Sequence, residues 1–599
     1  MSPLAFLAPA ISLALCLIPV FLLRRPAHAR AQDYFVSSDH TPPGVIQNSS
    51  IAYALKMATF GPFFAWGASG DFWPAIIGSS FFGLGSYLIY ILRRPMLQFL
   101  GSALQSDRSI TISEFVARRN GNDPRVRLLA SGLTAFALTG LLVCETIGIA
   151  TVLKPVLSGS AGLAYLIVFG VLTFMALCTI PSGNSGAMYS AQLQLGMLYL
   201  GLFGATVFLL YLRVSALICM PPHATLAIAF VTAFCLAIPI YRRSRFVDRN
   251  LITGPASNAG ARDSLSAKQL SRLQSFLNVC ISVLAALVVV VALMELGSDG
   301  ASTIIRDSVA ALQAPTRVPY IGLLALILLP LFYPIVDITN WQRIAAFEKD
   351  RDVNLDESSQ WSAAFKRFCR LYATESPLAL LFMCAFGAIV TVSAATPGET
   401  DVMQAFISDL ISQQNEVATI GMSLLLVGML AMAASTMSAL FSASLCTFRY
   451  DILPTLWQEP ASGGAQALAE ATATRRTILV GAGLCLAILL ASYLIGEYLG
   501  ITFTSGKFLG LVFAFSCAQL AFVPLFLGPL IDQTGEGHGA VGPKWALGIL
   551  GCGAAMGVAA VTVYFATGHE PWLWAAVPAC LATGAVLFAI ARRQAARAA

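Results

Sequence analysis

Two adjacent hydroxyl side chains lie deep inside an apolar stretch of the sequence. Ser435 and Thr436 fall within residues 418–447, a run that contains no charged residue. A hard cation such as Na⁺ prefers oxygen ligands, and two neighbouring hydroxyls would supply part of such a site. The alternative is that each hydroxyl only bonds back to a carbonyl one turn earlier, which is common in membrane helices.

A lysine interrupts a second apolar stretch, residues 47–68, which also contains Gly61 and Pro62. The Gly-Pro pair predicts a break in the helix. At membrane depth Lys56 would cost about 2.5–3.5 kcal/mol, so it must face a cavity or a partner. Its ammonium could replace a coupling cation, bind a substrate carboxylate or carry a proton, since buried lysines lose their proton readily. The alternative is a lysine that snorkels to the membrane surface.

Glu145 lies in the middle of a third apolar stretch, residues 126–156. We expect an ion pair between Glu145 and Lys56, because it would satisfy both charges inside the membrane. The alternative is a structural hydrogen bond to a neighbouring helix. Interrupted membrane helices expose carbonyls that hold a small cation and a solute near mid-depth, so these polar residues predict a transport site.

The composition is that of a polytopic membrane protein. Of the 599 residues, 57% are hydrophobic and 11% are charged, against about 25% charged in soluble proteins. Apolar runs predict an all-α chain with about fifteen transmembrane helices, and no polar stretch is long enough for a soluble domain. The predicted spans are 4–23, 47–68, 73–94, 126–156, 161–181, 188–213, 223–242, 275–296, 318–344, 376–397, 418–447, 476–499, 505–531, 545–567 and 571–592.

Charge and cysteine usage exclude several classes of function. The net charge of +6 is small, and the arginines fall in short loops, so we expect no nucleic-acid partner. The thirteen cysteines form no CxxC pair or Cys/His cluster, so no metal other than Na⁺ is predicted. Nor does the sequence contain the convergent nucleophile, base or ligand set of an enzyme. Basic loops on alternate sides predict an outside N-terminus and a cytoplasmic C-terminus, in the cytoplasmic (inner) membrane of a bacterium.

Five short motifs, taken in chain order, resemble motifs of the sodium:solute symporter family, and the match extends over residues 33–530. The chain resembles a divergent member. The aspartate of the family's TDxxQ motif is Ala191 here, and Lys56 stands where a neutral or acidic residue is more usual. The motifs occupy residues 33–35, 110–119, 181–194, 337–346 and 431–451.

The resemblance implies a LeuT-type fold, in which two five-helix repeats of inverted topology (5+5) form a core with discontinuous helices. Two further helices are expected between the repeats and two after them. On this basis the chain divides into an extra N-terminal helix with a basic loop (1–45), the first repeat (46–215), an inserted helix pair with a cytoplasmic loop (216–300), the second repeat (301–531) and two C-terminal helices (532–599).

The resemblance also implies a binding site. Ser435 and Thr436 match the family's paired Na⁺-binding hydroxyls. Partner carbonyls would come from Met432 and from the first broken helix, where two alignments select either Ile51 and Ala54 or Ala54 and Met57. The predicted cation-binding residues are therefore Ile51, Ala54, Met57, Met432, Ser435 and Thr436. The predicted substrate-binding residues, on the two broken helices and core helix 3, are Lys56, Ala58, Glu145, Asn340, Trp341 and Gln342.

On these grounds we expect a secondary active transporter that couples Na⁺ to the symport of a small polar organic solute by alternating access. Lys56 favours a carboxylate or an amino acid as the solute. A second hypothesis is a Na⁺-independent or proton-coupled carrier in which Lys56 replaces the coupling cation. A third, from another class, is a membrane sensor. The expected partners are the solute and the lipid bilayer, and the sequence leaves the oligomeric state open.

Overall fold

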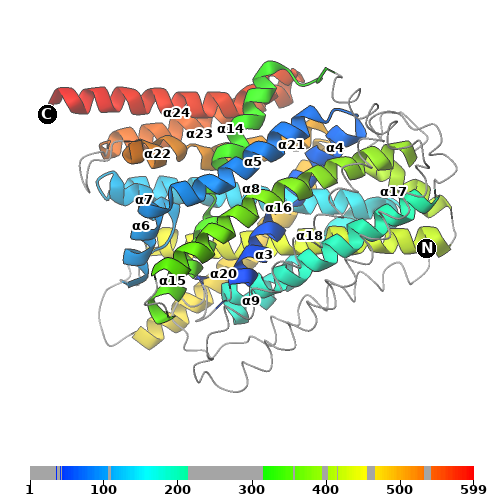
Figure 1. Cartoon of the computed structure of the whole chain (residues 1–599), viewed down its shortest axis with the longest axis horizontal. Coiled ribbons are helices and arrows are strands. Elements are labelled where there is room, and N and C mark those ends of the chain that lie inside the picture. Colours follow the sequence, from blue (N-terminus) through cyan, green and yellow to red (C-terminus); the bar gives the residue numbers. More distant parts are fainter. Residues whose placement is uncertain are drawn as a thin grey trace.

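The structure, a computed structural model, is a bundle of helices (Figure 1). In the part of the chain that it describes, every regular element is a helix. The described residues are 35–36, 41, 43–105, 109–212, 315–354, 358–393, 402–413, 416–454, 466–531 and 541–598. The predicted spans 4–23, 223–242 and 275–296 lie outside these residues.

Most of the predicted spans are found as helices. Eight described helices are long and apolar enough to cross a membrane, and a ninth span is a bent pair. The chain is therefore an integral membrane protein. The eight spans lie in α5 (Trp73–Ile91), α8 (Pro124–Val156), α16 (Ser358–Ser393), α18 (Glu416–Thr447), α20 (Gln466–Tyr493), α21 (Gly506–Leu520), α23 (Pro543–Thr567) and α24 (Glu570–Ala598), and a further long helix is α9 (Ala161–Leu212). The shorter ones are α6 (Arg93–Gln105), α7 (Ile112–Arg119), α17 (Val402–Ser412), η2 (Phe448–Ile452), η3 (Leu494–Tyr498) and α22 (Val523–Ile531).

Two spans are interrupted in the middle. The first consists of α3 (Pro43–Ala54) and α4 (Met57–Ala68). The second consists of α14 (Tyr320–Val336) and α15 (Ile338–Asn354), which bend by 42° at their junction. The prediction of a discontinuous helix in 47–68 is therefore confirmed, and the second interruption lies at Asp337.

The predicted position of the first break was wrong. The helix stops at Leu55 and Lys56, whereas Gly61 and Pro62 lie inside α4. The glycine has a packing role: a Cβ atom on Gly61 would lie 2.6 Å from the carbonyl oxygen of Phe503. The Gly-Pro pair therefore marks a close contact with the α20–α21 connection rather than the end of a helix.

The loop predicted between spans 161–181 and 188–213 was also wrong, because the backbone is helical throughout α9. Pro, Gly, Ser and Asn residues indicated a turn. In an apolar environment, however, a continuing helix satisfies its own backbone groups. With 52 residues, α9 extends over about 78 Å of helix, more than twice the bilayer's hydrocarbon thickness of about 30 Å.

The first interrupted helix lies inside the bundle (Figure 1), whereas α14 begins at the surface, where Tyr320 is 91% exposed. The α3 segment packs against α9, α16 and α18, and α4 packs against α8 and α16. The α14 segment packs between α5 and the C-terminal α24, and α23 and α24 run together along one edge of the bundle. Both breaks are therefore surrounded by other helices of the chain.

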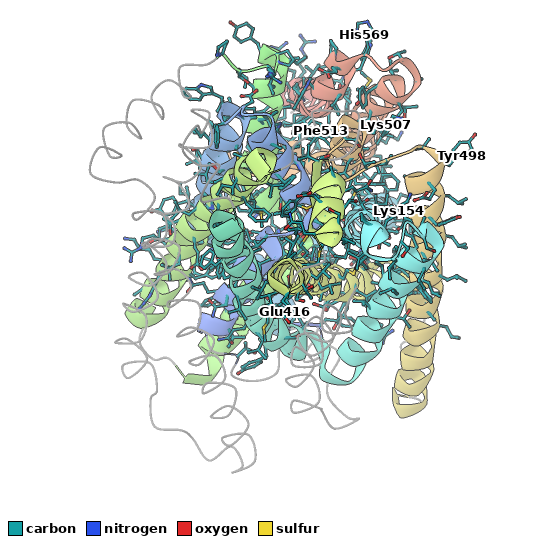
Figure 2. The ribbon with its side chains drawn as sticks, turned by 90° about the vertical axis from the view of Figure 1, so that its right-hand side faces the viewer. Lys154, Glu416, Tyr498, Lys507, Phe513 and His569 are labelled. Carbon is teal, nitrogen blue, oxygen red and sulfur yellow. The ribbon has the colours of Figure 1, made fainter. Side chains whose placement is uncertain are left out.

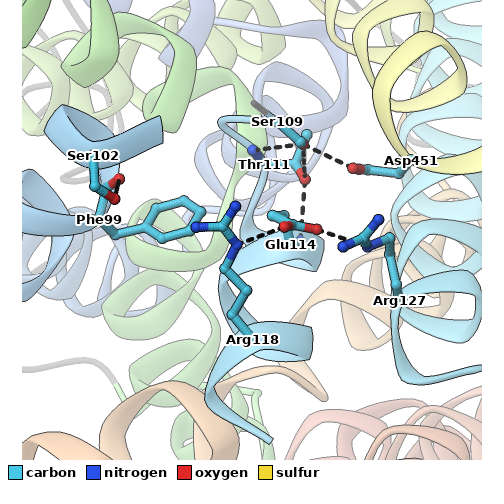
Figure 3. Close-up of polar contacts among 8 residues, drawn as sticks. All are labelled: Phe99, Ser102, Ser109, Thr111, Glu114, Arg118, Arg127 and Asp451. Atoms are coloured by element: carbon cyan, nitrogen blue, oxygen red, sulfur yellow. Dashed lines mark hydrogen bonds and ion pairs between the residues drawn. The ribbon is translucent and has the colours of Figure 1, made fainter. Parts of the chain in front are cut away.

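A network of charged and hydroxyl groups anchors α7 (Figure 3). Glu114 forms ion pairs with Arg118 (2.6 Å) on its own helix and with Arg127 (2.7 Å) on α8. Ser109, just before α7, donates to Asp451 in η2 at 2.8 Å. The family-like motif 110–119 therefore ties the start of α8 to the end of α18.

A further ion pair lies at the surface. Lys154 of α8 is 3.1 Å from Glu497 of η3, and both side chains are 35% exposed. Figure 2 shows Lys154 and Tyr498 toward the outside of the bundle. Exposed ion pairs contribute about 0–1 kcal/mol to the free energy of unfolding. Glu497 is therefore a suitable control for a variant of a buried carboxylate.

Candidate functional site

The break in the first span leaves the start of α4 without helical partners. Lys56 has an extended backbone (φ −112°, ψ 157°), so the hydrogen-bond ladder stops there. The carbonyl of Ala54 accepts a bond from the Thr59 hydroxyl at 3.0 Å. The amides at the beginning of α4 still need acceptors, because the first N–H groups of a helix have none within it.

Glu145 supplies those acceptors from α8. Its two carboxyl oxygens accept hydrogen bonds from the amides of Met57 and Ala58, each at 3.0 Å. The Glu145 side chain is completely buried. A negative group at a helix N-terminus is favoured by the aligned peptide dipoles, so Glu145 acts as an N-cap from another helix.

The predicted ion pair between Lys56 and Glu145 was wrong. The Lys56 ammonium donates to the Tyr333 hydroxyl at 3.3 Å. It also lies 4.8 Å from the ring centre of Tyr53 and 4.5 Å from that of Tyr333. Only 6% of Lys56 is exposed, so it does not snorkel to the surface. Backbone amides stabilise the charge of Glu145, and aromatic rings stabilise the charge of Lys56.

Tyr53 links both broken helices. Its hydroxyl lies 3.5 Å from that of Tyr333 on α14, and its ring lies 4.8 Å from the Arg343 guanidinium on α15. Arg343 also donates to Ser49 at 3.3 Å. Asp337, Glu145 and Arg343 interact electrostatically with the Lys56 ammonium. Two acidic and two basic side chains therefore meet around the breaks, and their formal charges cancel.

Asp337 organises the second break. Its Oδ1 accepts hydrogen bonds from the amide (3.0 Å) and the hydroxyl (2.8 Å) of Thr339, which caps the start of α15. Its Oδ2 is buried and accepts no hydrogen bond from a described residue.

The predicted substrate-binding residues of α15 lie at this break. Asn340 donates to the Pro334 carbonyl at 2.9 Å, and Trp341 donates to the Ile335 carbonyl at 2.8 Å. Both side chains replace helix donors that the interruption removes. Gln342 reaches the Phe35 carbonyl at 3.3 Å. A role of these three residues in solute binding stays a prediction.

The Trp341 ring lies in an aromatic cluster. Its ring centre is 5.4 Å from that of Phe115 and 6.0 Å from those of Phe99 and Phe526. These rings belong to α6, α7 and α22. The cluster holds α15 against α6, α7 and α22, and α7 is also the helix that the charged network anchors.

The predicted cation-binding hydroxyls lie beside the first break. Ser435 donates to Met432 at 2.9 Å, and its Oγ is 3.4 Å from the carbonyl of Ala52 on α3. Thr436 donates to the same Met432 carbonyl at 3.2 Å. In this geometry the hydroxyls back-bond along the helix, as the alternative interpretation expects.

The α3 carbonyl next to Ser435 is that of Ala52, and a role of the Ile51, Ala54 and Met57 carbonyls in cation binding stays a prediction. The Ile51 carbonyl accepts from the amide of Leu55 at 3.3 Å, and that of Ala54 is bonded to Thr59. The oxygens that fit a hard cation are those of Met432, Ser435, Thr436 and Ala52, provided that the two hydroxyls turn their protons away.

The predicted binding residues did not include three members of this cluster. Tyr53, Tyr333 and Arg343 surround Lys56 or its tyrosine partner. A signal did exist, because Tyr333 precedes Asp337 by one helical turn and Tyr53 lies three residues before Lys56. The pairing of the two spans, however, requires the tertiary structure.

Comparisons with known proteins support the fold. No family model and no curated protein matches the chain. Twenty-two chains of solved structures match. One is described as the substrate-bound outward-open state of a Na⁺-coupled sialic acid symporter with a novel Na⁺ site. The similarity covers 98% of each chain, with a TM-score of 0.56 and 14% sequence identity. The chain thus shares the overall fold of that symporter.

Proposed function

We propose that this chain is a secondary active transporter that moves a small polar organic solute across the membrane by alternating access, coupled to Na⁺. One observation carries the proposal: two interrupted helices meet inside the bundle, with the hydroxyl pair of α18 beside the first of them. Such breaks are where secondary transporters bind ions and solutes. The fold shared with a Na⁺-coupled symporter supports the same conclusion.

In this proposal Na⁺ binds between α18 and the end of α3. Ser435, Thr436 and the carbonyls of Met432 and Ala52 would supply oxygens, with Ile51, Ala54 and Met57 as the further candidates from the family resemblance. A cation there would hold α3 against α18 and favour one conformation of the bundle. The ion and the solute would then raise each other's affinity by a coupling that is typically about 5–150-fold.

The solute would lie between the two breaks, next to Lys56, Ala58 and Glu145 on one side and the start of α15 on the other. Lys56 favours a solute with a carboxylate, such as an organic acid or an amino acid. Sialic acid, which the similar symporter carries, is a suitable first test compound because it has a carboxylate.

The test is uptake into proteoliposomes with and without a sodium gradient. We expect Ser435→Ala/Thr436→Ala to remove most of the sodium stimulation, because two of the proposed ligands are lost. Ser438→Ala is the matched control: its hydroxyl is on the same helix and bonds back to the Ser435 carbonyl at 3.0 Å. Sodium stimulation that is unchanged in the double variant would contradict the assigned site.

A second candidate, a Na⁺-independent or proton-coupled carrier, is favoured by the buried ammonium of Lys56 between the two interrupted helices. In this version Lys56 takes the place of the coupling cation. We expect wild-type uptake without sodium, and a Lys56→Ala variant that gains sodium dependence. Sodium-driven uptake by the wild type would exclude this candidate in favour of the first.

A further inference from the structure

Lys56 occupies a box whose walls come from both interrupted helices. Tyr53 stands at the end of α3 and Tyr333 near the end of α14, and the Lys56 nitrogen lies 4.8 Å and 4.5 Å from their ring centres. The Tyr333 hydroxyl accepts a hydrogen bond from it at 3.3 Å. Aromatic faces and an acceptor oxygen are the groups that recognise organic ammonium ions.

The box also has an unused acceptor. Asp337 Oδ2 is fully buried and accepts no hydrogen bond from a described residue. Asp337 acts electrostatically on Tyr53, Lys56 and Tyr333, so it belongs to the same cluster. A buried carboxylate oxygen without a donor is costly unless a ligand or partner satisfies it. The cluster therefore offers more to a cation than the lysine uses.

The lysine is held in this position by its own backbone. Lys56 lies at the break, where its amide bonds to the Thr59 hydroxyl at 3.2 Å. Its carbonyl accepts from the amides of Thr59 (2.9 Å) and Phe60 (2.7 Å). The ammonium is therefore tethered to a fixed point. An untethered ammonium ion would not be subject to this constraint.

We propose that Tyr53, Tyr333 and Asp337 form a binding site for a small primary ammonium ion, and that Lys56 fills this site in the wild-type protein. The proposal deepens the second candidate mechanism, and its consequence for transport rests on that mechanism. In it, Tyr53, Tyr333 and Asp337 keep the lysine in the place of a coupling cation. Its ligand class is a primary ammonium with a short alkyl chain, rather than a bare metal ion.

The test uses a probe that matches the deleted atoms. Lys56→Ala removes three methylene groups and the ammonium, which together correspond to n-propylammonium. In thermal melts of the purified protein, we expect Lys56→Ala to unfold at a lower temperature than the wild type. Millimolar n-propylammonium is expected to restore about 3 °C or more in a saturable manner. Sodium chloride and 1-propanol at equal concentrations should restore nothing, since they lack the charge or the shape.

Matched variants show whether n-propylammonium binds between Tyr53, Tyr333 and Asp337. Lys56→Met refills the space with an apolar chain, so its melting temperature should not respond to the probe. Adding Asp337→Asn to Lys56→Ala should weaken the response at least tenfold in apparent affinity. Lys154→Ala, which removes the exposed lysine of Figure 2, should not respond.

The proposal is overturned when Lys56→Ala shows no response, when it responds equally to sodium chloride, or when Lys56→Met responds as strongly. A Lys56→Ala protein that is recovered in folded form only with n-propylammonium present supports it, and one that is not recovered even then contradicts it. These melts need no transport activity, so their outcome is independent of the uptake test of the proposed function.

Discussion

Glu145→Ala is expected to free the start of α4 and to destabilise the whole site. The change removes both acceptors of the Met57 and Ala58 amides and leaves two buried donors unsatisfied. Losing hydrogen bonds to a charged group costs on the order of 3 kcal/mol in total. Amide hydrogen exchange at these two positions should therefore accelerate about 100-fold, and the melting temperature should fall by several degrees.

Glu145→Gln should give an intermediate result. The amide keeps one acceptor oxygen, but its NH₂ group faces the second backbone N–H. Glu497→Gln is the matched control, because that carboxylate is 35% exposed and pairs with Lys154 at the surface. We expect it to change the melting temperature little. Exchange at Met57 and Ala58 that is the same in Glu145→Ala and wild type would show that the cap contributes nothing.

The interrupted helices could be predicted from residue types, because polar groups in an apolar run need a reason. Lys56, Glu145 and the pair Ser435 and Thr436 stood out in this way, and the structure places each of them beside a break or a neighbouring helix. The position of the first break could not be predicted as well. Gly61 and Pro62 looked like helix breakers, yet a close contact with Phe503 explains the glycine.

The pairing of charges could not be predicted, because it depends on which helices pack together. Sequence reasoning placed two opposite charges in one membrane region and paired them. In the structure, Glu145 instead accepts hydrogen bonds at the N-terminus of α4, and Lys56 contacts the rings of Tyr53 and Tyr333. Helix termini and aromatic faces are competing partners for a buried charge. Neither is visible until the tertiary contacts are known.

The α4 segment is packed much more tightly against α16 than its sequence indicates. A Cβ atom on Gly67 would lie 1.7 Å from the carbonyl oxygen of Cys384, and one on Gly387 would lie 2.1 Å from that of Phe64. The two glycines thus allow each helix backbone to contact the other. Since backbone contacts of this kind leave little room for sliding, we infer that α4 and α16 move as one body during the proposed alternating access.

Gly67→Ala tests this packing, and we expect a large effect. Its methyl group would meet the backbone of α16, which cannot swing aside as a side chain does, so the helices must separate. Overpacking of this kind costs about 1–3 kcal/mol or more, and the melting temperature should fall accordingly. Gly548→Ala on α23 is the control, since a Cβ there meets nothing within 4 Å; it should be neutral or slightly stabilising because alanine favours helix. Equal melting temperatures for both variants would mean that α4 and α16 are not locked together, and the hinge of the proposed transporter would then have to be sought between them.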